Sequence, residues 1–419
     1  MIVTSSETLP RSGEAAPALH KLSAKTKAKA VSMLLVAPLV AFILLVFVLP
    51  LGGMLFYAVN NTEVRDALPG VAAEMAAWKD EGLPPDSAYA ALARDLKAGF
   101  GDSKLAEAGR RLNYERSGYR ALLSKTARAV QAIDHPAESW ASELARVDAR
   151  WLEPATWAAM RRAIPALTPF YILAALDLRV DDHGAVTAAP VEERLYVDTL
   201  GRTLWIGFMT TALCLALGFP LAHALVSLPR RFAALLMMSI LLPFWTSLLV
   251  RTSAWIVVLQ KEGIVNKALT GLGLIDAPLE LVFNRTGLYI AMVHILLPFM
   301  ILPILSVMKG ISPAYMKASA SLGAHPVIGF FKVYLPMVLP GVGAGCLMTF
   351  IIAVGYYITP TLVGGAQDQM TSYFVAYYAN TTINWGMSAA LGAILLVCVM
   401  FLYATVGRLI GVSRIAGIT

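Results

Sequence analysis

The chain has 419 residues, of which 58% are hydrophobic and only 15% are charged. Soluble globular proteins average roughly 45–50% apolar and about 25% charged residues, so this composition excludes an ordinary soluble enzyme. Residues 58–195 hold 17 basic and 20 acidic side chains, whereas the other 281 residues hold 17 basic and 7 acidic ones. The pI of about 9.2 is therefore a property of the apolar part and does not indicate nucleic-acid binding. We predict a membrane protein with one charged, water-soluble insertion.

The amino-terminal region predicts a short tail followed by a membrane span. Four lysines, Lys21, Lys25, Lys27 and Lys29, precede the 27-residue apolar run 31–57. A cleaved signal peptide has an apolar region of only about 7–15 residues and a small-residue cleavage site. We therefore expect a cytoplasmic tail over residues 1–30 and an uncleaved transmembrane helix over 31–57.

Five further stretches are long and apolar enough to cross a bilayer, which takes about 20 residues of helix. The six predicted spans are 31–57, 199–227, 232–259, 286–308, 334–362 and 387–410. Lipid-exposed backbone must satisfy its own hydrogen bonds, so all six are predicted to be helices. Internal prolines such as Pro243, Pro298 and Pro340 predict kinks. The three cysteines, Cys214, Cys346 and Cys398, lie in these apolar runs and are interpreted as packing residues.

The positive charges predict the orientation. Lys and Arg accumulate in cytoplasmic loops. One side carries Arg11, Lys21, Lys25, Lys27, Lys29, Arg230, Arg231, Lys309, Lys317, Lys332, Arg408 and Arg414, and the short loops of the other side carry Lys261, Lys267 and Arg285. Both termini, including the tail 411–419, are thus expected on the cytoplasmic side of a bacterial inner membrane. The insertion 58–195 is expected outside, in the periplasm of a Gram-negative cell.

The insertion predicts a small α+β domain. Ser87–Gly99 and Tyr119–Ala132 have apolar residues at helical spacing, and 176–180 with 185–186 indicates two strands joined by a turn. The turn residues Asp181, Asp182 and His183 are interpreted as a polar turn rather than metal ligands. Trp140, Trp151 and Trp157 are expected to make core or docking contacts.

A helix–turn–helix is predicted between spans four and five. Ser312 and Pro313 form a helix start, Gly323 is a left-handed helix stop, and Pro326 starts the next helix. Ala318, Ser319 and Ala320 give this segment small surfaces that suit close docking to a partner protein. A simple connecting loop explains these features equally well.

The spacing within this segment resembles a known family. Lys317-Ala318-Ser319, three residues, Gly323, nine residues, Val333, one residue and Leu335-Pro336 matches the EAA-x3-G-x9-I-x-LP loop of ABC importer permeases. Lys317 stands where the family usually has Glu, and Ser319 replaces its second Ala. The resemblance covers roughly residues 195–415 and is closest to the spermidine/putrescine permease type, through LLPFWTSLLVRTSAWIVVLQKEGIVN (241–266), LLPFMILPILSVM (296–308) and VGYYITPTLVGGAQDQMTSYF (354–374).

The resemblance implies an all-α membrane protein with the six-helix type I importer permease fold, whose core covers 196–410 and includes a coupling loop at 309–336. It implies that the coupling contact is made by Lys317, Ala318, Ser319, Gly323, Ala324, Val333, Leu335 and Pro336. It also implies two ATP-binding partner subunits that hold ATP and magnesium, a second permease subunit, and a periplasmic binding protein that delivers substrate.

The resemblance implies that the chain is not itself an enzyme and holds no cofactor, and the sequence contains no G-x4-G-K-[ST] phosphate loop. Spermidine or putrescine is the first expected substrate, and related permeases carry opines, iron, thiamine or amino-acid derivatives. A nucleotide-independent transporter or channel, a membrane sensor or scaffold, and an intramembrane catalyst are the alternatives from other classes.

Polar and aromatic residues in the spans are the candidates for the transport pathway. They are Arg251, Trp255, Tyr356, Tyr357, Thr359 and Asp368. Arg251 is expected either to snorkel to the outer interface or to pair inside the bundle. It would repel a cationic substrate, so an ion pair or bonds to carbonyls at a helix break fit better than a lining role. Tyr356 and Tyr357 flank a Gly/Pro helix break, and an interfacial aromatic belt is the alternative interpretation. Asp368 is interpreted as a solvated loop residue in preference to a cation contact, and His223 and His294 as packing or hydrogen-bonded residues.

Overall fold

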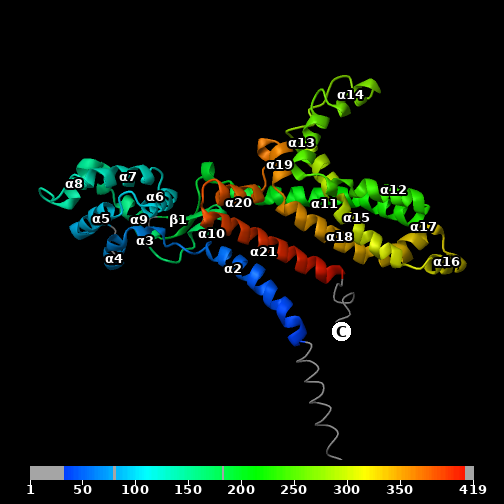
Figure 1. Cartoon of the computed structure of the whole chain (residues 1–419), viewed down its shortest axis with the longest axis horizontal. Coiled ribbons are helices and arrows are strands. Elements are labelled where there is room, and N and C mark those ends of the chain that lie inside the picture. Colours follow the sequence, from blue (N-terminus) through cyan, green and yellow to red (C-terminus); the bar gives the residue numbers. More distant parts are fainter. Residues whose placement is uncertain (1–32, 79–81, 182–183, 411–419) are drawn as a thin grey trace, which may run out of the picture. The chain divides into compact units, whose positions relative to one another are not determined.

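The computed structural model describes residues 33–78, 82–181 and 184–410 (Figure 1). The predicted tails 1–30 and 411–419, together with Asp182 and His183, lie outside the described residues. The chain divides into two compact units, one ending at Phe56 and one beginning at Tyr57.

The described part of the first unit, residues 33–56, is one apolar helix. It runs from Met33 to Phe56 and includes a π-helical turn, η1 (Leu44–Val48), followed by α2 (Leu49–Phe56). Pro50 has no N–H for the carbonyl of Val46, and the wider π-turn lies at this point of the helix. The helix contains no charged residue and has 24 residues, enough to span about 30 Å of hydrocarbon. The predicted first span is therefore confirmed as a helix over its described part.

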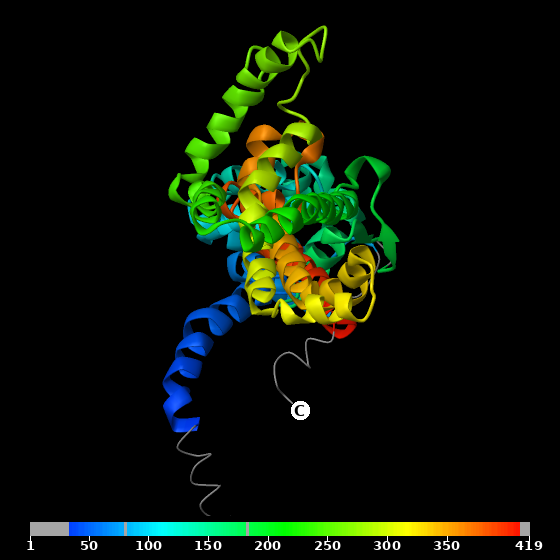
Figure 2. The same ribbon diagram turned by 90° about the vertical axis from the view of Figure 1, so that its right-hand side faces the viewer.

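The second unit contains a membrane core built on three long helices, α11 (Tyr196–Ser227), α15 (Arg285–Gly310) and α18 (Leu335–Gly355), which pack against one another (Figures 1 and 2). Glycines allow these backbones to approach closely. A Cβ on Gly207 would lie 2.8 Å from Val354, and one on Gly345 would lie 2.8 Å from the carbonyl oxygen of Met300. The predicted spans two and four are confirmed as continuous helices.

Span three is not the single helix predicted over 232–259. α12 (Arg230–Leu241) ends in a 3-10 turn, η4 (Leu242–Trp245), after which α13 (Leu248–Leu259) and α14 (Ile264–Gly271) turn away by 108°. Pro243 cannot donate to the helix ladder, and Thr246 and Ser247 adopt extended backbone. The apolar composition predicted the length of this region and missed its change of direction.

The bounds predicted for span five also need correction. A helix runs from Pro326 through α17 (Pro326–Gly329), a π-turn η5 (Phe330–Tyr334) and α18, and it ends at Gly355. Tyr356 is extended, and a separate short helix, α19 (Ile358–Val363), follows. The remaining core elements are η6 (Ala366–Asp368), α20 (Thr371–Asn380) and α21 (Trp385–Ile410). By length and composition, the described part of the chain has five candidate spans, or six if the bent pair counts as one.

The insertion is a helical domain with one β-hairpin. Its helices are α3 (Glu63–Ala67), α4 (Pro69–Ala77), α5 (Asp86–Ala98), α6 (Ser103–Glu115), α7 (Tyr119–Val130), α8 (Trp140–Val147), η2 (Ala149–Leu152), α9 (Pro154–Ala163), α10 (Phe170–Ala175) and η3 (Val191–Glu193). Strands β1 (Leu178–Val180) and β2 (Val186–Ala188) pair antiparallel, with Arg179 opposite Thr187. The predicted helices at 87–99 and 119–132 and the two predicted strands are confirmed.

The core of the insertion forms around Trp151 and Trp157, which are completely buried with ring centroids 5.5 Å apart. Trp140 packs at the edge of the same cluster. A second apolar cluster joins α10 to the membrane core, where Tyr171 contacts Gly386 in the first turn of α21. The end of the insertion is therefore packed directly onto the transmembrane helices.

Candidate functional site

Two broken helices meet in the membrane core. α13 and α19, the segments that follow the breaks in spans three and five, are in contact. The hydroxyl oxygens of Thr252 on α13 and Thr359 on α19 are 3.2 Å apart, and both residues are completely buried. Thr359, predicted as a polar lining residue, is thus used to join the two segments. Its partner Thr252 was not predicted, because one threonine in an apolar helix has no distinguishing sequence pattern.

Arg251 holds the break of span three. Its guanidinium donates to the carbonyl oxygens of Pro243 and Thr246, the latter at 2.8 Å, and its Nε donates to the Thr246 hydroxyl at 3.1 Å. These carbonyls end the α12–η4 segment, where a helix carries partial negative charge. The interpretation of Arg251 as a residue bonded to carbonyls at a helix break is confirmed.

Trp255 lies one turn further along α13, on the side facing α15. Its indole N–H donates to Nδ1 of His294 at 3.2 Å, and the two rings meet edge to face at 5.2 Å. The bond fits the interpretation of His294 as a hydrogen-bonded helix residue. His223 of α11 packs edge-on against Tyr334 at 5.8 Å, in agreement with a packing role.

Tyr356 and Tyr357 occupy the break between α18 and α19. Tyr356 is half-buried, and its carbonyl oxygen accepts a 2.9 Å hydrogen bond from the Ser372 hydroxyl of α20. Tyr357 begins α19 and keeps 37% of its surface exposed. An unpaired carbonyl at a helix break inside a membrane is costly, and Ser372 satisfies it.

The structure corrects the interpretation of Asp368. This residue is buried, with only 5% of its surface exposed, and is not a solvated loop residue. One carboxylate oxygen accepts from Nε of Arg285 at 2.8 Å, and the other accepts from the backbone N–H of Gly365 at 3.1 Å. Arg285 lies at the start of α15, 83 residues away, so the local sequence could not predict that the two residues pair. The pair fixes the loop after α19 to the start of α15.

The segment 312–336, here called the elbow, has the predicted helix–turn–helix form. α16 (Ala314–Ser321) begins after Ser312, whose hydroxyl accepts from the N–H of Ala314 at 3.3 Å. Gly323 has φ +82°, the left-handed conformation expected of a helix stop, and α17 begins at Pro326. The elbow packs on α11, since the ring centroids of Phe219 on α11 and Phe330 on the elbow lie 6.2 Å apart.

The residues of the predicted coupling contact divide between the surface and the interior of the elbow. Lys317, Ala318, Gly323 and Pro336 are exposed, and Ala324, Val333 and Leu335 are partly buried. Ser319 is buried against Gly329, where a Cβ would lie 2.9 Å from the Ser319 hydroxyl. Ser319 therefore serves the packing of α16 on α17.

Hydroxyls, indole, imidazole and tyrosine rings surround the two breaks, with the ion pair of Arg285 and Asp368 nearby. Within the described ranges, no three His, Cys, Asp or Glu side chains come together as metal ligands would.

Comparison with known proteins places this arrangement in a family. No protein-family model matches the chain. The spermidine/putrescine transport system permease protein PotB of Salmonella typhimurium (strain SL1344) is 32% identical over 196 residues, covering 47% of this chain and 68% of PotB. The inner membrane ABC transporter permease protein YdcU of Escherichia coli (strain K12) is 31% identical over 230 residues, covering 51% of this chain and 71% of YdcU.

Among solved structures, a bacterial alginate ABC transporter in complex with an alginate pentasaccharide-bound periplasmic protein matches 51% of this chain and 79% of its own chain, with 16% identity and a TM-score of 0.42. Permease subunits of ABC importers carry no ATPase activity and no cofactor, because ATP is bound by a separate subunit. The extent and identity of the match to PotB show that this chain belongs to the ABC importer permeases.

Proposed function

We propose that this chain forms half of the membrane pathway of an ATP-driven importer, and that the imported solute is a polyamine such as spermidine or putrescine. The observation that carries the proposal is the 32% identity to PotB over two thirds of that permease. The paired helix breaks support it, because irregular backbone within a membrane is tolerated where it is buried in protein or lines a cavity.

The assembly that we propose has four other subunits. They are two ATP-binding subunits, a second permease subunit that is a different polypeptide, and a periplasmic binding protein. In this assembly the chain lies in the bacterial inner membrane with both tails in the cytoplasm, and residues 58–195 form the extracytoplasmic domain.

The two breaks are proposed to line the path of the solute. Tyrosine faces attract an ammonium group by roughly 0.5–2 kcal/mol, depending on desolvation, and Tyr357 is accessible. The charge of Arg251 is directed at the carbonyls of Pro243 and Thr246, which offsets part of its repulsion for a cation. Trp255, Tyr356 and Asp368 complete the proposed lining, with Asp368 acting through its pair with Arg285.

The elbow is proposed as the contact with an ATP-binding subunit. It exposes large apolar side chains, among them Leu322 (89% exposed), Val327, Ile328 and Phe331. A dense apolar patch of this kind marks an interaction surface. Lys317 is also exposed on the elbow. We therefore expect the ATP-binding subunit to present negative charge to Lys317, whereas a permease with Glu at this position would need positive charge there.

The proposal is tested with the complex purified in nanodiscs together with its binding protein. We expect spermidine or putrescine to stimulate ATP hydrolysis, with iron, thiamine and opines as comparison solutes. Stimulation by one of these and not by either polyamine would replace the substrate assignment.

The coupling role is tested by Gly323→Asp. An aspartate strains the left-handed backbone and adds charge to the apolar contact, so we expect solute-stimulated hydrolysis to be lost while the chain still inserts in the membrane. Gly101→Asp is the matched control, because Gly101 has the same left-handed backbone (φ +86°), has nothing within 4 Å of an added Cβ and lies in the insertion, outside the coupling loop. Normal stimulation in Gly323→Asp would refute the coupling role.

A further inference from the structure

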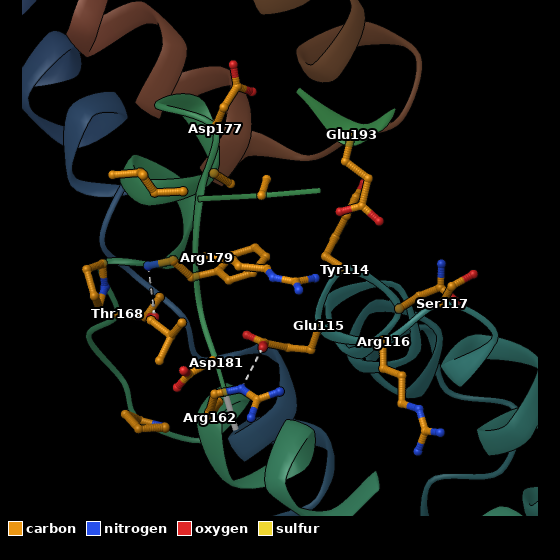
Figure 3. Close-up of a pocket in the computed structure, with 18 of the residues that line it drawn as sticks. Tyr114, Glu115, Arg116, Ser117, Arg162, Thr168, Asp177, Arg179, Asp181 and Glu193 are labelled. Carbon is orange, nitrogen blue, oxygen red and sulfur yellow. Dashed lines mark hydrogen bonds and ion pairs between the residues drawn. The ribbon is translucent and has the colours of Figure 1, made fainter. Parts of the chain in front are cut away.

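The insertion contains a cavity of about 710 Å³ between two groups of elements. One wall is formed by the end of α6 and by α9, and the other by α10, strand β1 and the first residue of α11 (Figure 3). Small-molecule sites typically occupy about 300–1,000 Å³. The apolar side chains of Leu167, Phe170 and Leu178 contribute to the lining alongside charged groups.

Several charged groups of the lining are already neutralised within the protein. Glu115 accepts from Arg111 at 2.9 Å and from Arg162 at 3.1 Å, so one carboxylate faces two guanidinium groups. Asp177 accepts from three consecutive backbone N–H groups, those of residues 195–197. Arg116 bonds Glu153 and the Thr156 hydroxyl. These groups build the walls and are not available to a ligand.

Asp181 also lines the cavity, and its carboxylate accepts from the backbone N–H of Ala185 at 2.8 Å. Two charges of opposite sign remain. Neither Arg179 of β1 nor Glu193 of η3 has a side-chain hydrogen bond or ion pair with any described residue, and they are not paired with each other. Figure 3 shows both side chains pointing into the space between the walls. The hydroxyls of Tyr114 and Ser117 line the same space and likewise have no partner in the described part of the chain.

We propose that this cavity binds a zwitterionic amino acid, with its carboxylate on Arg179 and its ammonium group on Glu193. A guanidinium binds a carboxylate through two parallel hydrogen bonds, and a carboxylate accepts from an ammonium group. A polycation is disfavoured because it would leave Arg179 facing like charge. A simple dicarboxylate is disfavoured because it would leave Glu193 facing like charge.

The back of the cavity is rigid. Arg111 is buried and lies 4.1 Å from the ring of Phe170, and its Nε donates to the Asn61 side chain at 2.6 Å. Groups held in this way hold their geometry before a ligand arrives, which favours binding. The same wall reaches the membrane core, since Tyr171 contacts Gly386 and the hydroxyls of Tyr196 and Tyr378 are bonded. The ligand would therefore lie at the joint between the insertion and the transmembrane helices.

The experiment is calorimetric titration of the full chain in nanodiscs with each of the twenty proteinogenic L-amino acids, and with spermidine. We expect one-to-one binding of at least one amino acid, with its decarboxylated and deaminated analogues each at least about tenfold weaker. Binding of none of the twenty amino acids, or displacement of the bound amino acid by spermidine, would overturn the proposal.

The two variants Arg179→Gln and Glu193→Gln separate the two ends of the ligand. Each is expected to weaken binding of the amino acid by about tenfold. Arg179→Gln should leave the affinity for the decarboxylated analogue unchanged, and Glu193→Gln should leave the affinity for the deaminated analogue unchanged. Arg94→Gln and Glu192→Gln are the matched controls, since both residues are exposed and lie outside the cavity lining. Equal affinity in Arg179→Gln and in Arg94→Gln would overturn the assignment of the carboxylate end.

Discussion

The insertion and the membrane core bury their interiors by different means. The insertion buries aromatic rings, with Trp151 and Trp157 at its centre, and seven of the ion pairs found in the described residues lie in it. The membrane core brings backbones together at glycines such as Gly207 and Gly345, and its polar contacts are mainly hydroxyl bonds such as Thr252 to Thr359. In water, the hydrophobic effect rewards burial of large side chains, whereas between helices in lipid close packing and hydrogen bonds must supply the stability.

The largest expected loss of stability follows from removing a central aromatic ring of the insertion. Trp151→Ala removes a completely buried side chain whose N–H donates to Thr126 at 2.9 Å, and we expect a cost of about 3–5 kcal/mol. Limited proteolysis should then cleave within 58–195 while the transmembrane helices stay intact. Trp140→Ala, at the edge of the same cluster, is the control and should cost less. Equal protection of both variants would show that the insertion does not depend on its aromatic core.

In the membrane core the corresponding change adds volume instead of removing it. Gly345→Val places a side chain where a Cβ already lies 2.8 Å from the Met300 carbonyl oxygen, so we expect a cost of about 1–3 kcal/mol and a lower Tm. Gly392→Val in α21 is the control, because nothing lies within 4 Å of its added Cβ. Thermal unfolding in detergent that gives the same Tm for both variants would contradict close packing as the source of core stability.

The ion pair between Arg285 and the buried Asp368 is an exception to this contrast, and Asp368→Asn tests how much it contributes to stability. The change removes the charge that meets Arg285 and keeps an acceptor for the Gly365 N–H. Because Arg285 remains 45% exposed and can be solvated, we expect a loss of only about 1 kcal/mol, measured as a fall in Tm. Glu280→Gln, in the exposed pair with Lys261, should leave the Tm unchanged.

The smallest effect is a pH dependence of the insertion. Hydrogen bonds from Arg150, with smaller help from Lys125, hold the pKa of Asp148 well below its usual value. A carboxylate with a depressed folded-state pKa stabilises the fold above its unfolded pKa of about 3.9, and this contribution is lost as the pH falls below that value. The Tm of the insertion should therefore fall between pH 5 and about pH 3. Asp148→Asn should flatten this part of the profile, and an unchanged slope would contradict the assignment.

Local patterns predicted the features that depend on neighbours in sequence. Apolar run lengths predicted the long helices of spans one, two, four and six, and Gly323 and Pro326 predicted the elbow. The bend after Pro243 was missed, because a hydropathy window sums composition over a stretch and carries no information on chain direction.

Contacts between distant residues could not be predicted. Asp368 was placed in solvent because its partner Arg285 is 83 residues away, and the Thr252–Thr359 bond joins residues separated by 107 positions. The cavity of the insertion arises in the same way, since its walls come from α6 and α9 on one side and from β1 and α10 on the other.

The most direct test of the account is uptake of labelled spermidine by proteoliposomes that contain the permease pair, its ATP-binding subunits and the binding protein. We predict uptake that requires internal ATP and the binding protein, and that is abolished by Gly323→Asp but retained in Gly101→Asp. Uptake that proceeds without ATP, or equal uptake by the two glycine variants, would contradict the proposed role of this chain as an ATP-coupled permease subunit.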